Sequence, residues 1–234
     1  MKLLKLSIII PCLNEAENIR STLVPLQEAR KRGHEIILCD GGSTDNTVSL
    51  SQELVDISIQ SDSGRAIQMN TGASYASGDV LCFLHADTIA PNEIDQLITS
   101  ALMDSKKIWG RFNVRLSSSF WIYRIIESLM NVRSCLSAIA TGDQGIFICR
   151  NIFSKISGYA DLPLMEDIEI SKRLRKISRP HCISKARLIT SSRRWEQHGI
   201  LKTVFLMWSL RLKYFLGVSP VSLAQYYAVN DDTK

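Results

Sequence analysis

The stretch LCFLHADTIAP, residues 81–91, runs from almost unbroken apolar residues into a histidine, a carboxylate and a proline. An apolar run of this length is typical of a buried strand. In an open parallel sheet, ligands bind at the carboxyl ends of the strands, where loops and helix N-termini converge. His85 and Asp87 stand at such an end. This interpretation of the fold requires that the rest of the chain supplies the neighbouring strands.

Apolar runs of strand length do recur in the first half of the chain, and segments with a helical pattern separate them. The runs are LSIIIP (6–11), EIILCD (35–40), VDISIQ (55–60) and DVLCFLH (79–85). This alternation is typical of a parallel sheet covered by helices. The first strand ends at PCLNE, the second at CDGGSTD and the fourth at HADT, so we expect three polar strand ends to meet in one crevice.

The pattern loosens after about residue 105. IWGRFNVRL (108–116) predicts an edge strand, FWIYRIIESLMNVRSCLSAIA (120–140) a helix, GIFICR (145–150) a short buried strand and EDIEISKRLRKI (166–177) an amphipathic helix. We predict one α/β domain at 1–199, with a nucleotide-binding half at about 1–105 and an acceptor half at about 106–199. A C-terminal helical segment follows at 200–234.

Composition narrows the functional classes. The chain has 234 residues, 45% of them hydrophobic, which is enough for one sizeable core. Its net charge of +5 is modest, and its Lys and Arg residues are scattered rather than gathered in a block. A nucleic-acid partner therefore has little support. The N-terminal MKLLKLSIIIP predicts a first strand rather than a signal peptide. The segment 200–218 is interrupted by three basic residues, so we expect no transmembrane segment.

Cysteine usage indicates the compartment. Four of the six cysteines lie in or beside strand-like runs, and no two are spaced as C-x-x-C: Cys12, Cys39, Cys82 and Cys149. We therefore predict buried free thiols in a reducing compartment rather than disulfides or zinc. The expected location is cytoplasmic, with the inner membrane surface as an alternative.

Five motifs, taken together and in this order, resemble family-2 glycosyltransferases of the GT-A fold over roughly residues 4–195. They are LSIIIPCLNEAENI, EIILCDGGSTDNT, GRAIQMNTGASYASGDVLCFLHADT, TGDQGIF and LMEDIEISKRL. The sequence is most similar to small soluble members with His-Ala-Asp in place of Asp-x-Asp. The resemblance implies a Rossmann-like, mostly parallel sheet flanked by helices. It also implies metal-assisted, inverting transfer of a single sugar from a nucleotide-diphosphate sugar to an acceptor hydroxyl.

The resemblance assigns a donor-nucleotide site to the ends of the first strands. Its members are Pro11, Asn14, Glu15, Asp40, Gly41, Arg65, Ala86 and Asp87. The Asp40 carboxylate would accept a hydrogen bond from the base, with a UDP-sugar favoured. Arg65 would hold the nucleotide at a helix N-terminus. The alternatives are that Asp40 only begins a turn, that Asn14 only caps a helix and that Arg65 is a solvated surface residue.

A divalent metal, Mn²⁺ or Mg²⁺, would stabilise the leaving diphosphate, and Asp87 is the first candidate ligand. His85 replaces the first Asp of the family pattern and is a better ligand for Mn²⁺ than for Mg²⁺. Its alternative role is a hydrogen bond to sugar or phosphate. His198 is a third candidate ligand, with an exposed surface histidine as the alternative.

The catalytic prediction rests on Glu166 and Asp167, at the first turn of a predicted helix. By resemblance, Asp167 is the general base that deprotonates the acceptor hydroxyl, and Glu166 orients it or binds the acceptor. The alternative is the ordinary preference for acids at helix N-termini.

Two further pairs are predicted to contact the acceptor or the donor sugar. Asp143 and Gln144 form the first pair, and a plain turn is their alternative. Arg194 and Trp195 form the second, in a segment similar to the Q-x-x-R-W signature of processive synthases. Ser191 stands where that signature has Gln, which favours single-sugar transfer. A Trp packed in the core is the alternative for Trp195.

The segment 200–218 carries an apolar stripe at helical spacing: Leu201, Phe205, Trp208, Leu212 and Phe215. Packing against the domain or a partner subunit of a homo-oligomer is one expectation. Contact with a membrane surface that holds a lipid-linked acceptor is the other. Two other function classes stay open. One is a nucleotidyltransferase, although PCLNEAENI replaces its expected Gly-rich loop. The other is a sugar-nucleotide-binding module without turnover.

Overall fold

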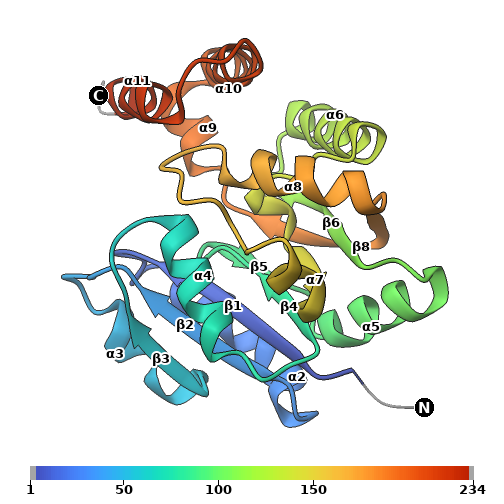
Figure 1. Cartoon of the computed structure of the whole chain (residues 1–234). Coiled ribbons are helices and arrows are strands. Elements are labelled where there is room, and N and C mark those ends of the chain that lie inside the picture. Colours follow the sequence, from blue (N-terminus) through green and yellow to red (C-terminus); the bar gives the residue numbers. More distant parts are fainter. Residues whose placement is uncertain (1–3, 232–234) are drawn as a thin grey trace.

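A mixed eight-stranded sheet forms the centre of the molecule in the computed structural model, which describes residues 4–231 (Figure 1). The strand order is β3-β2-β1-β4-β7-β6-β8-β5. The strands are β1 (Leu6–Cys12), β2 (Glu35–Asp40), β3 (Ile57–Gln60), β4 (Val80–Phe83), β5 (Thr88–Ile89), β6 (Trp109–Leu116), β7 (Ile146–Cys149) and β8 (His181–Thr190).

Helices cover both faces of this sheet. They are α1 (Ile19–Leu23), α2 (Gln27–Lys31), α3 (Thr47–Ser51), α4 (Arg65–Tyr75), α5 (Ile94–Ser105), α6 (Trp121–Ser137), α7 (Arg150–Lys155), α8 (Glu166–Ile177), α9 (Arg193–His198), α10 (Ile200–Phe215) and α11 (Pro220–Asp231). Residues of α1, α2 and α5 build the core on one face, and residues of α4, α7 and α8 build the core on the other. The structure confirms the predicted α/β fold with a C-terminal helical segment.

The first half of the chain forms the predicted parallel sheet, in the order β3-β2-β1-β4. All residues of β1 are buried, because helices pack on both faces of that strand. The chain passes from β1 to β2 and β3 on one side and then crosses to β4 on the other. The carboxyl ends of β1 and β4 are therefore the topological switch point at which open sheets bind ligands.

The prediction that IWGRFNVRL is an edge strand is wrong. Strand β6 lies between β7 and β8, and β8 was not predicted at all. The polar residues of β6 suggested an edge, but the Arg111 side chain is buried and donates to the backbone carbonyls of Phe112 and Asn131. Internal hydrogen bonds thus pair both terminal guanidinium nitrogens of a side chain that looks solvent-facing in the sequence.

The cysteines confirm the prediction in part. Cys12, Cys39, Cys82 and Cys149 are free thiols, as expected. However, Cys135 and Cys182 form a disulfide between the end of α6 and the start of β8, with the two Cα atoms 6.2 Å apart. The expectation of free thiols throughout is therefore wrong. The two residues are 47 positions apart, so their spacing in the sequence does not indicate that they pair. They come together because Cys182 lies on strand β8, which was not predicted.

The C-terminal helices α9, α10 and α11 lie above the second half of the sheet (Figure 1). Leu210 of α10 and Leu223 of α11 are buried against Met165 and Ile168. The predicted apolar stripe of α10 is not the face that packs, because all five of its residues are exposed. Packing of that stripe against the domain is therefore wrong. In the described residues, no helix combines the length and apolar character needed to cross a membrane.

Candidate active site

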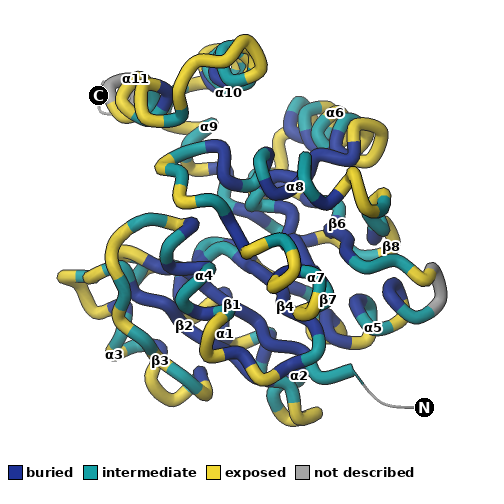
Figure 2. Tube along the Cα trace, in the orientation of Figure 1, coloured by how far each residue is buried: buried dark blue, intermediate teal, exposed yellow. Residues whose placement is uncertain are grey.

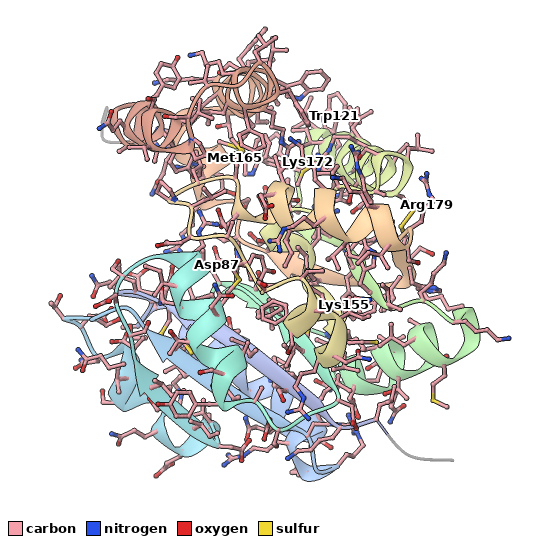
Figure 3. The ribbon with its side chains drawn as sticks, in the orientation of Figure 1. Asp87, Trp121, Lys155, Met165, Lys172 and Arg179 are labelled. Atoms are coloured by element: carbon pink, nitrogen blue, oxygen red, sulfur yellow. A yellow bond between two sulfur atoms is a disulfide. The ribbon has the colours of Figure 1, made fainter. Side chains whose placement is uncertain are left out.

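An open cleft of about 330 Å³ lies at the carboxyl ends of β1 and β4. Five residues of the predicted donor site line it: Pro11, Glu15, Arg65, Ala86 and Asp87. His85 lines it as well, and Figure 3 places Asp87 where the two halves of the molecule meet. The sequence therefore predicted most of the wall of this cleft, because three strand ends converge on one edge of a parallel sheet.

Gln68 of α4 is a cleft residue that the sequence analysis missed. Its side-chain amide donates to the carbonyls of Cys12 and Cys39, at 2.7 and 2.8 Å, and so ties together the ends of β1 and β2. A Cβ at Gly41 would lie only 3.1 Å from the Gln68 amide nitrogen. The glycine there allows this clamp to form. Gln68 belongs to the GRAIQMNTG motif, but the sequence analysis assigned a role only to Arg65 of that motif.

Asp40 and Asn14 hold the loop between the two strand ends. The Asp40 carboxylate accepts from the backbone N–H groups of Gly42 and Ser43 and from the Ser43 hydroxyl. Asn14 has a left-handed backbone, and its side-chain oxygen accepts from the Thr44 N–H. Asn14 does not cap a helix, since α1 begins only at Ile19. Both residues shape the rim of the cleft through the turn at 40–44, and neither lines its wall.

Arg65 is the first residue of α4 and connects the cleft with the second half of the chain. Its guanidinium Nε lies 3.8 Å from a carboxylate oxygen of Glu166, the first residue of α8. Arg65 therefore lies at the N-terminus of one helix and faces an acid at the N-terminus of another. Its half-exposed side chain leaves N–H donors free to reach an anion in the cleft.

A small enclosed cavity lies next to the cleft and is lined by Met69, Phe83, His85, Gly142, Ile146, Tyr159, Glu166 and Asp167. Both predicted catalytic acids are thus in its wall. His85 lines the cavity and the cleft alike, so the two spaces adjoin at this residue. This arrangement places the Glu-Asp pair beside the predicted donor site, although about 80 residues separate them in the sequence.

Asp167 is oriented by two backbone donors. Its Oδ2 accepts from the Gly142 N–H at 3.0 Å, and its Oδ1 accepts from the Ile168 N–H at 2.7 Å. A carboxylate has about four acceptor positions, so each oxygen keeps one for a further donor. The side chain is fixed in place by these bonds, and it can still accept a proton or a hydroxyl hydrogen.

Glu166 has a different environment from its neighbour. It is buried, and burial together with the adjacent Asp167 raises its pKa, while Arg65 opposes the rise. Tyr159 is a cavity residue that the sequence analysis missed, and burial followed by the two acids raises the pKa of its phenol. Burial and the neighbouring acid thus make Glu166 harder to ionise than an exposed glutamate, and Tyr159 stays a neutral donor beside the two acids.

His85 is a neutral imidazole at neutral pH. Burial, and then the nearby Arg65, lower the pKa of His85 to about 3. Its ring lies against Gly142, where an added Cβ would be only 2.4 Å from Nε2. A glycine at 142 is thus required for the ring to reach the cavity. A neutral imidazole can bind a metal or make a hydrogen bond, so both predicted roles remain chemically available.

Asp87 sits in an excess of negative charge. Burial raises its pKa, Glu15 and Asp143 add to the rise, and Arg193 opposes it. Arg193 also lies 3.4 Å from Glu15 and 3.6 Å from Glu17. The sequence analysis chose Arg194 for this region, but Arg193 of α9 is the residue that meets the acids of the cleft. A short helix gives too little periodicity to tell the two arginines apart.

Arg194, Trp195 and His198 have other positions on α9. The Arg194 guanidinium stacks over the ring of Tyr227 in α11, at 4.0 Å from its centroid, and Trp195 and His198 are partly buried. In the part of the chain that the structure describes, no three His, Cys, Asp or Glu side chains are grouped to hold a metal ion. Asp87, His85 and His198 therefore do not form a closed protein site.

The loop at 141–145 places Asp143 near Asp167 and buries the side chain of Gln144. Asp143 is close enough to Asp167 for the two charges to interact, and burial and Asp167 raise the pKa of Asp143. Gln144 is fully buried, and its carbonyl oxygen accepts from Ser134 and Thr141 in a capping box. The Gln144 oxygen thus closes its own turn, while its buried amide nitrogen has no partner among the described residues, and the contact with a sugar stays a prediction.

Two arginines missed by the sequence analysis face these acids. Burial and the nearby Arg211 lower the pKa of Arg133 to about 10, while Asp143 and Asp167 oppose the shift. Nε and Nη2 of Arg133 are buried and have no hydrogen-bond partner among the described residues. Arg133 comes from α6 and Arg211 from α10, so the second half and the C-terminal segment both contribute positive charge near Asp167.

Comparison with known proteins agrees with this geometry. A sequence model of the family described as glycosyl transferase family 2 matches residues 7–155. Poly-beta-1,6-N-acetyl-D-glucosamine synthase of Staphylococcus aureus is 31% identical over 189 residues, which are 72% of this chain and 45% of that protein. A glycosyltransferase of Escherichia coli, YibD, is 28% identical over 127 residues, 51% of this chain and 35% of that protein. The chain thus spans less than half the length of these relatives.

Solved structures share the fold. S. aureus TarS in complex with UDP has a TM-score of 0.67 at 14% identity, over 80% of this chain and 60% of that one. A mannosyltransferase of Pyrobaculum calidifontis in complex with GDP-Man and Mn²⁺ has a TM-score of 0.60 at 17% identity, over 82% and 57%. The family match covers the donor cleft and the loop at Gly142. The chain therefore belongs to glycosyl transferase family 2.

Proposed function

We propose that this chain transfers a single sugar from a nucleotide-diphosphate sugar to an acceptor hydroxyl, with inversion at the anomeric carbon and assistance from a divalent metal. The observation that carries the proposal is the position of His85, which lines both the cleft at the strand ends and the cavity of Glu166 and Asp167. A donor bound in the cleft would therefore present its sugar towards the acid pair.

The donor would be held at the cleft by its negative charge. Arg65 at the N-terminus of α4 and Arg193 of α9 are the basic side chains on this rim. TarS is bound to UDP or UDP-GlcNAc in two of its structures, and the mannosyltransferase is bound to GDP-Man. We favour a UDP-sugar. We do not propose that Asp40 contacts the base, because its carboxylate already accepts hydrogen bonds within the turn at 40–44.

In the reaction, Asp167 takes the proton of the acceptor hydroxyl while that oxygen attacks the anomeric carbon. The bond from the anomeric carbon to the diphosphate breaks, and the diphosphate leaves with the bonding electrons from the opposite face. Asp167 is held for this by the Gly142 and Ile168 N–H groups. Glu166, which lines the same cavity, would orient Asp167 or bind the acceptor. One direct displacement inverts the anomeric centre.

The residues present fit a divalent cation that the donor completes. No other described residue donates a hydrogen bond to the Asp87 carboxylate. Burial, and then the charges of Glu15 and Asp143, raise its pKa, so a cation there would favour the ionised carboxylate. Mg²⁺ and Mn²⁺ are commonly held by one or two carboxylates together with substrate phosphates. Asp87 would hold the ion and the neutral His85 would add a nitrogen ligand. When bound, the metal would neutralise charge on the leaving diphosphate.

Transfer of one sugar, rather than polymer synthesis, is supported by Ser191. The processive signature has Gln at this position, and here the neighbouring Arg194 stacks on Tyr227. The S. aureus synthase to which the chain is similar is named for a polymer product, but it is more than twice as long as the matched part. Polymer formation is therefore not carried over to this chain.

The experiment that tests the proposal is incubation with a panel of sugar nucleotides and Mn²⁺, followed by chromatography of the nucleotides. We expect slow release of the nucleoside diphosphate, because water replaces the acceptor. Release of nucleoside monophosphate or pyrophosphate would indicate nucleotidyl chemistry. Tight binding with no product from any donor would indicate a binding module, and either result would contradict the proposal.

A further inference from the structure

The C-terminal helix α10 presents a large apolar face that is mostly exposed, although Lys172 of α8 lies over the Phe215 ring at its end. Leu201 and Phe205 are each 74% exposed, and Trp208 is 69% exposed. Leu212, Phe215 and Leu216 extend the same stripe to the end of the helix. These positions recur every three or four residues, so they share one side of the helix. Leu210, on the other side, is the residue that packs into the domain.

Helix α6 carries a second stripe of the same kind, which was not expected. Trp121, Ile125, Leu129, Val132 and Leu136 are all exposed, again at intervals of three or four residues. Phe120 precedes the helix and is 69% exposed. Figure 1 places α6 and α10 at the same end of the molecule, away from β3 and α3, and Figure 2 shows exposed turns on both helices. Exposed apolar stripes on two helices are typical of docking surfaces rather than of a monomer in water.

Charge distinguishes the possible occupants of this surface. Segment 200–218 contains Lys202, Arg211 and Lys213 and no acid. The one acid of α6, Glu127, is buried and paired with Arg124 and Arg187. Helix α8, which Figure 1 shows below both helices, ends with Arg175 and Lys176. Two copies of this chain that met through the α6 and α10 faces would bring like charges together, which is unfavourable.

We propose that the apolar stripes of α6 and α10 dock the protein on an anionic lipid bilayer. Basic residues beside an apolar stripe with exposed Trp and Phe are the features of helices that lie in the membrane interface. Trp121 and Trp208 would lie at the level of the lipid head groups, and Lys202 and Lys213 would meet their phosphates.

Docking in this orientation would place the catalytic acids near the lipid surface. Leu210 of α10 packs against Met165 and Ile168, which flank the Glu166–Asp167 pair on either side. Arg133 of α6 and Arg211 of α10 interact with the charge of Asp143 or Asp167. If the chain transfers a sugar as proposed above, the acceptor hydroxyl then belongs to an amphipathic molecule in the bilayer. This consequence, unlike the docking itself, rests on the proposed function.

Vesicle co-sedimentation of the full chain, without any substrate, tests the docking alone. We expect binding to vesicles of phosphatidylcholine mixed with phosphatidylglycerol and weaker binding to phosphatidylcholine alone. The double variants Phe205→Ser/Trp208→Ser on α10 and Trp121→Ser/Leu129→Ser on α6 should each lower the partition coefficient at least ~10-fold. Lys202→Gln/Lys213→Gln should remove the preference for anionic lipid.

Val24→Ser/Tyr75→Ser is the matched control, since Val24 and Tyr75 are exposed apolar residues on α1–α2 and α4. It should bind vesicles as the parent does, and UDP-dependent thermal shifts should be equal in all variants. No binding of the parent to anionic vesicles, or equal binding by every variant, would overturn the proposal. So would a dimer, seen by light scattering, that the α10 variant dissociates, because a second copy would then cover the face. A failure of the proposed function would appear separately, as an absence of nucleotide release.

Discussion

Asp167→Asn is expected to lower the transfer rate at least ~100-fold while the donor binds about as tightly as to the parent. An amide keeps the size of the side chain and its hydrogen bond from Gly142 N–H, but it cannot take a proton from the acceptor. The carboxylate contacts backbone N–H groups within the second half of the chain and does not line the donor cleft. Steady-state rates of nucleotide release and calorimetric titration with the donor measure the two effects.

Asp161→Asn is the control for this change, because Asp161 is an exposed acid in the loop that leads into α8. Its rate should equal that of the parent. Glu166→Gln should have a smaller effect on rate than Asp167→Asn, since a Gln side chain still donates a hydrogen bond. Near-normal turnover by Asp167→Asn would show that another group is the base.

Asp87→Asn is expected to abolish the Mn²⁺-dependent part of donor binding and to leave the fold intact. Among the described residues, the carboxylate accepts a hydrogen bond only from its own backbone, and its charge is the main attraction for a cation. In thermal-shift measurements, a ligand at a hundredfold excess over its Kd stabilises by about 2.7 kcal/mol. The parent should show that shift with UDP-sugar and Mn²⁺, and the variant should show only the shift seen without metal.

Two further variants sharpen the metal assignment. Asp62→Asn changes an exposed acid beside Ser63, which lines the same cleft, and it should bind donor and Mn²⁺ as the parent does. His85→Asp should broaden the response from Mn²⁺ towards Mg²⁺, because a carboxylate oxygen suits the harder ion. If Asp87→Asn keeps the full Mn²⁺-dependent shift, Asp87 is not a ligand. If His85→Asp leaves the metal preference unchanged, His85 contacts the sugar or phosphate instead.

The first half of the fold could be predicted because its signals are local. Each buried parallel strand is a continuous apolar run, and β1 and β4 lead directly into residues that line the cleft. The second half could not be predicted in full, because β8 has mixed polar and apolar residues and Arg111 of β6 finds its partners within the chain. Missing β8 also hid the disulfide between Cys135 and Cys182.

The positions of Asp87 in the cleft and of Asp167 in the cavity could be predicted, because a motif fixes each of them at a strand or helix end. Other site residues were missed where they act through contacts far along the chain. Gln68 clamps two strand ends, Tyr159 reaches the cavity from the loop before α8, and Arg133 faces acids from another helix. The capping role of Gln144 was missed as well, because the sequence does not show that its oxygen closes a turn.

The anomeric configuration of the released sugar tests direct displacement at Asp167 most directly. When an α-linked UDP-sugar and Mn²⁺ are followed by proton NMR, water acts as the acceptor and the first free sugar can be observed before its anomers equilibrate. The mechanism predicts that the β-anomer accumulates first and that Asp167→Asn suppresses it. Initial accumulation of the α-anomer would contradict a single inverting displacement and with it the role given to Asp167.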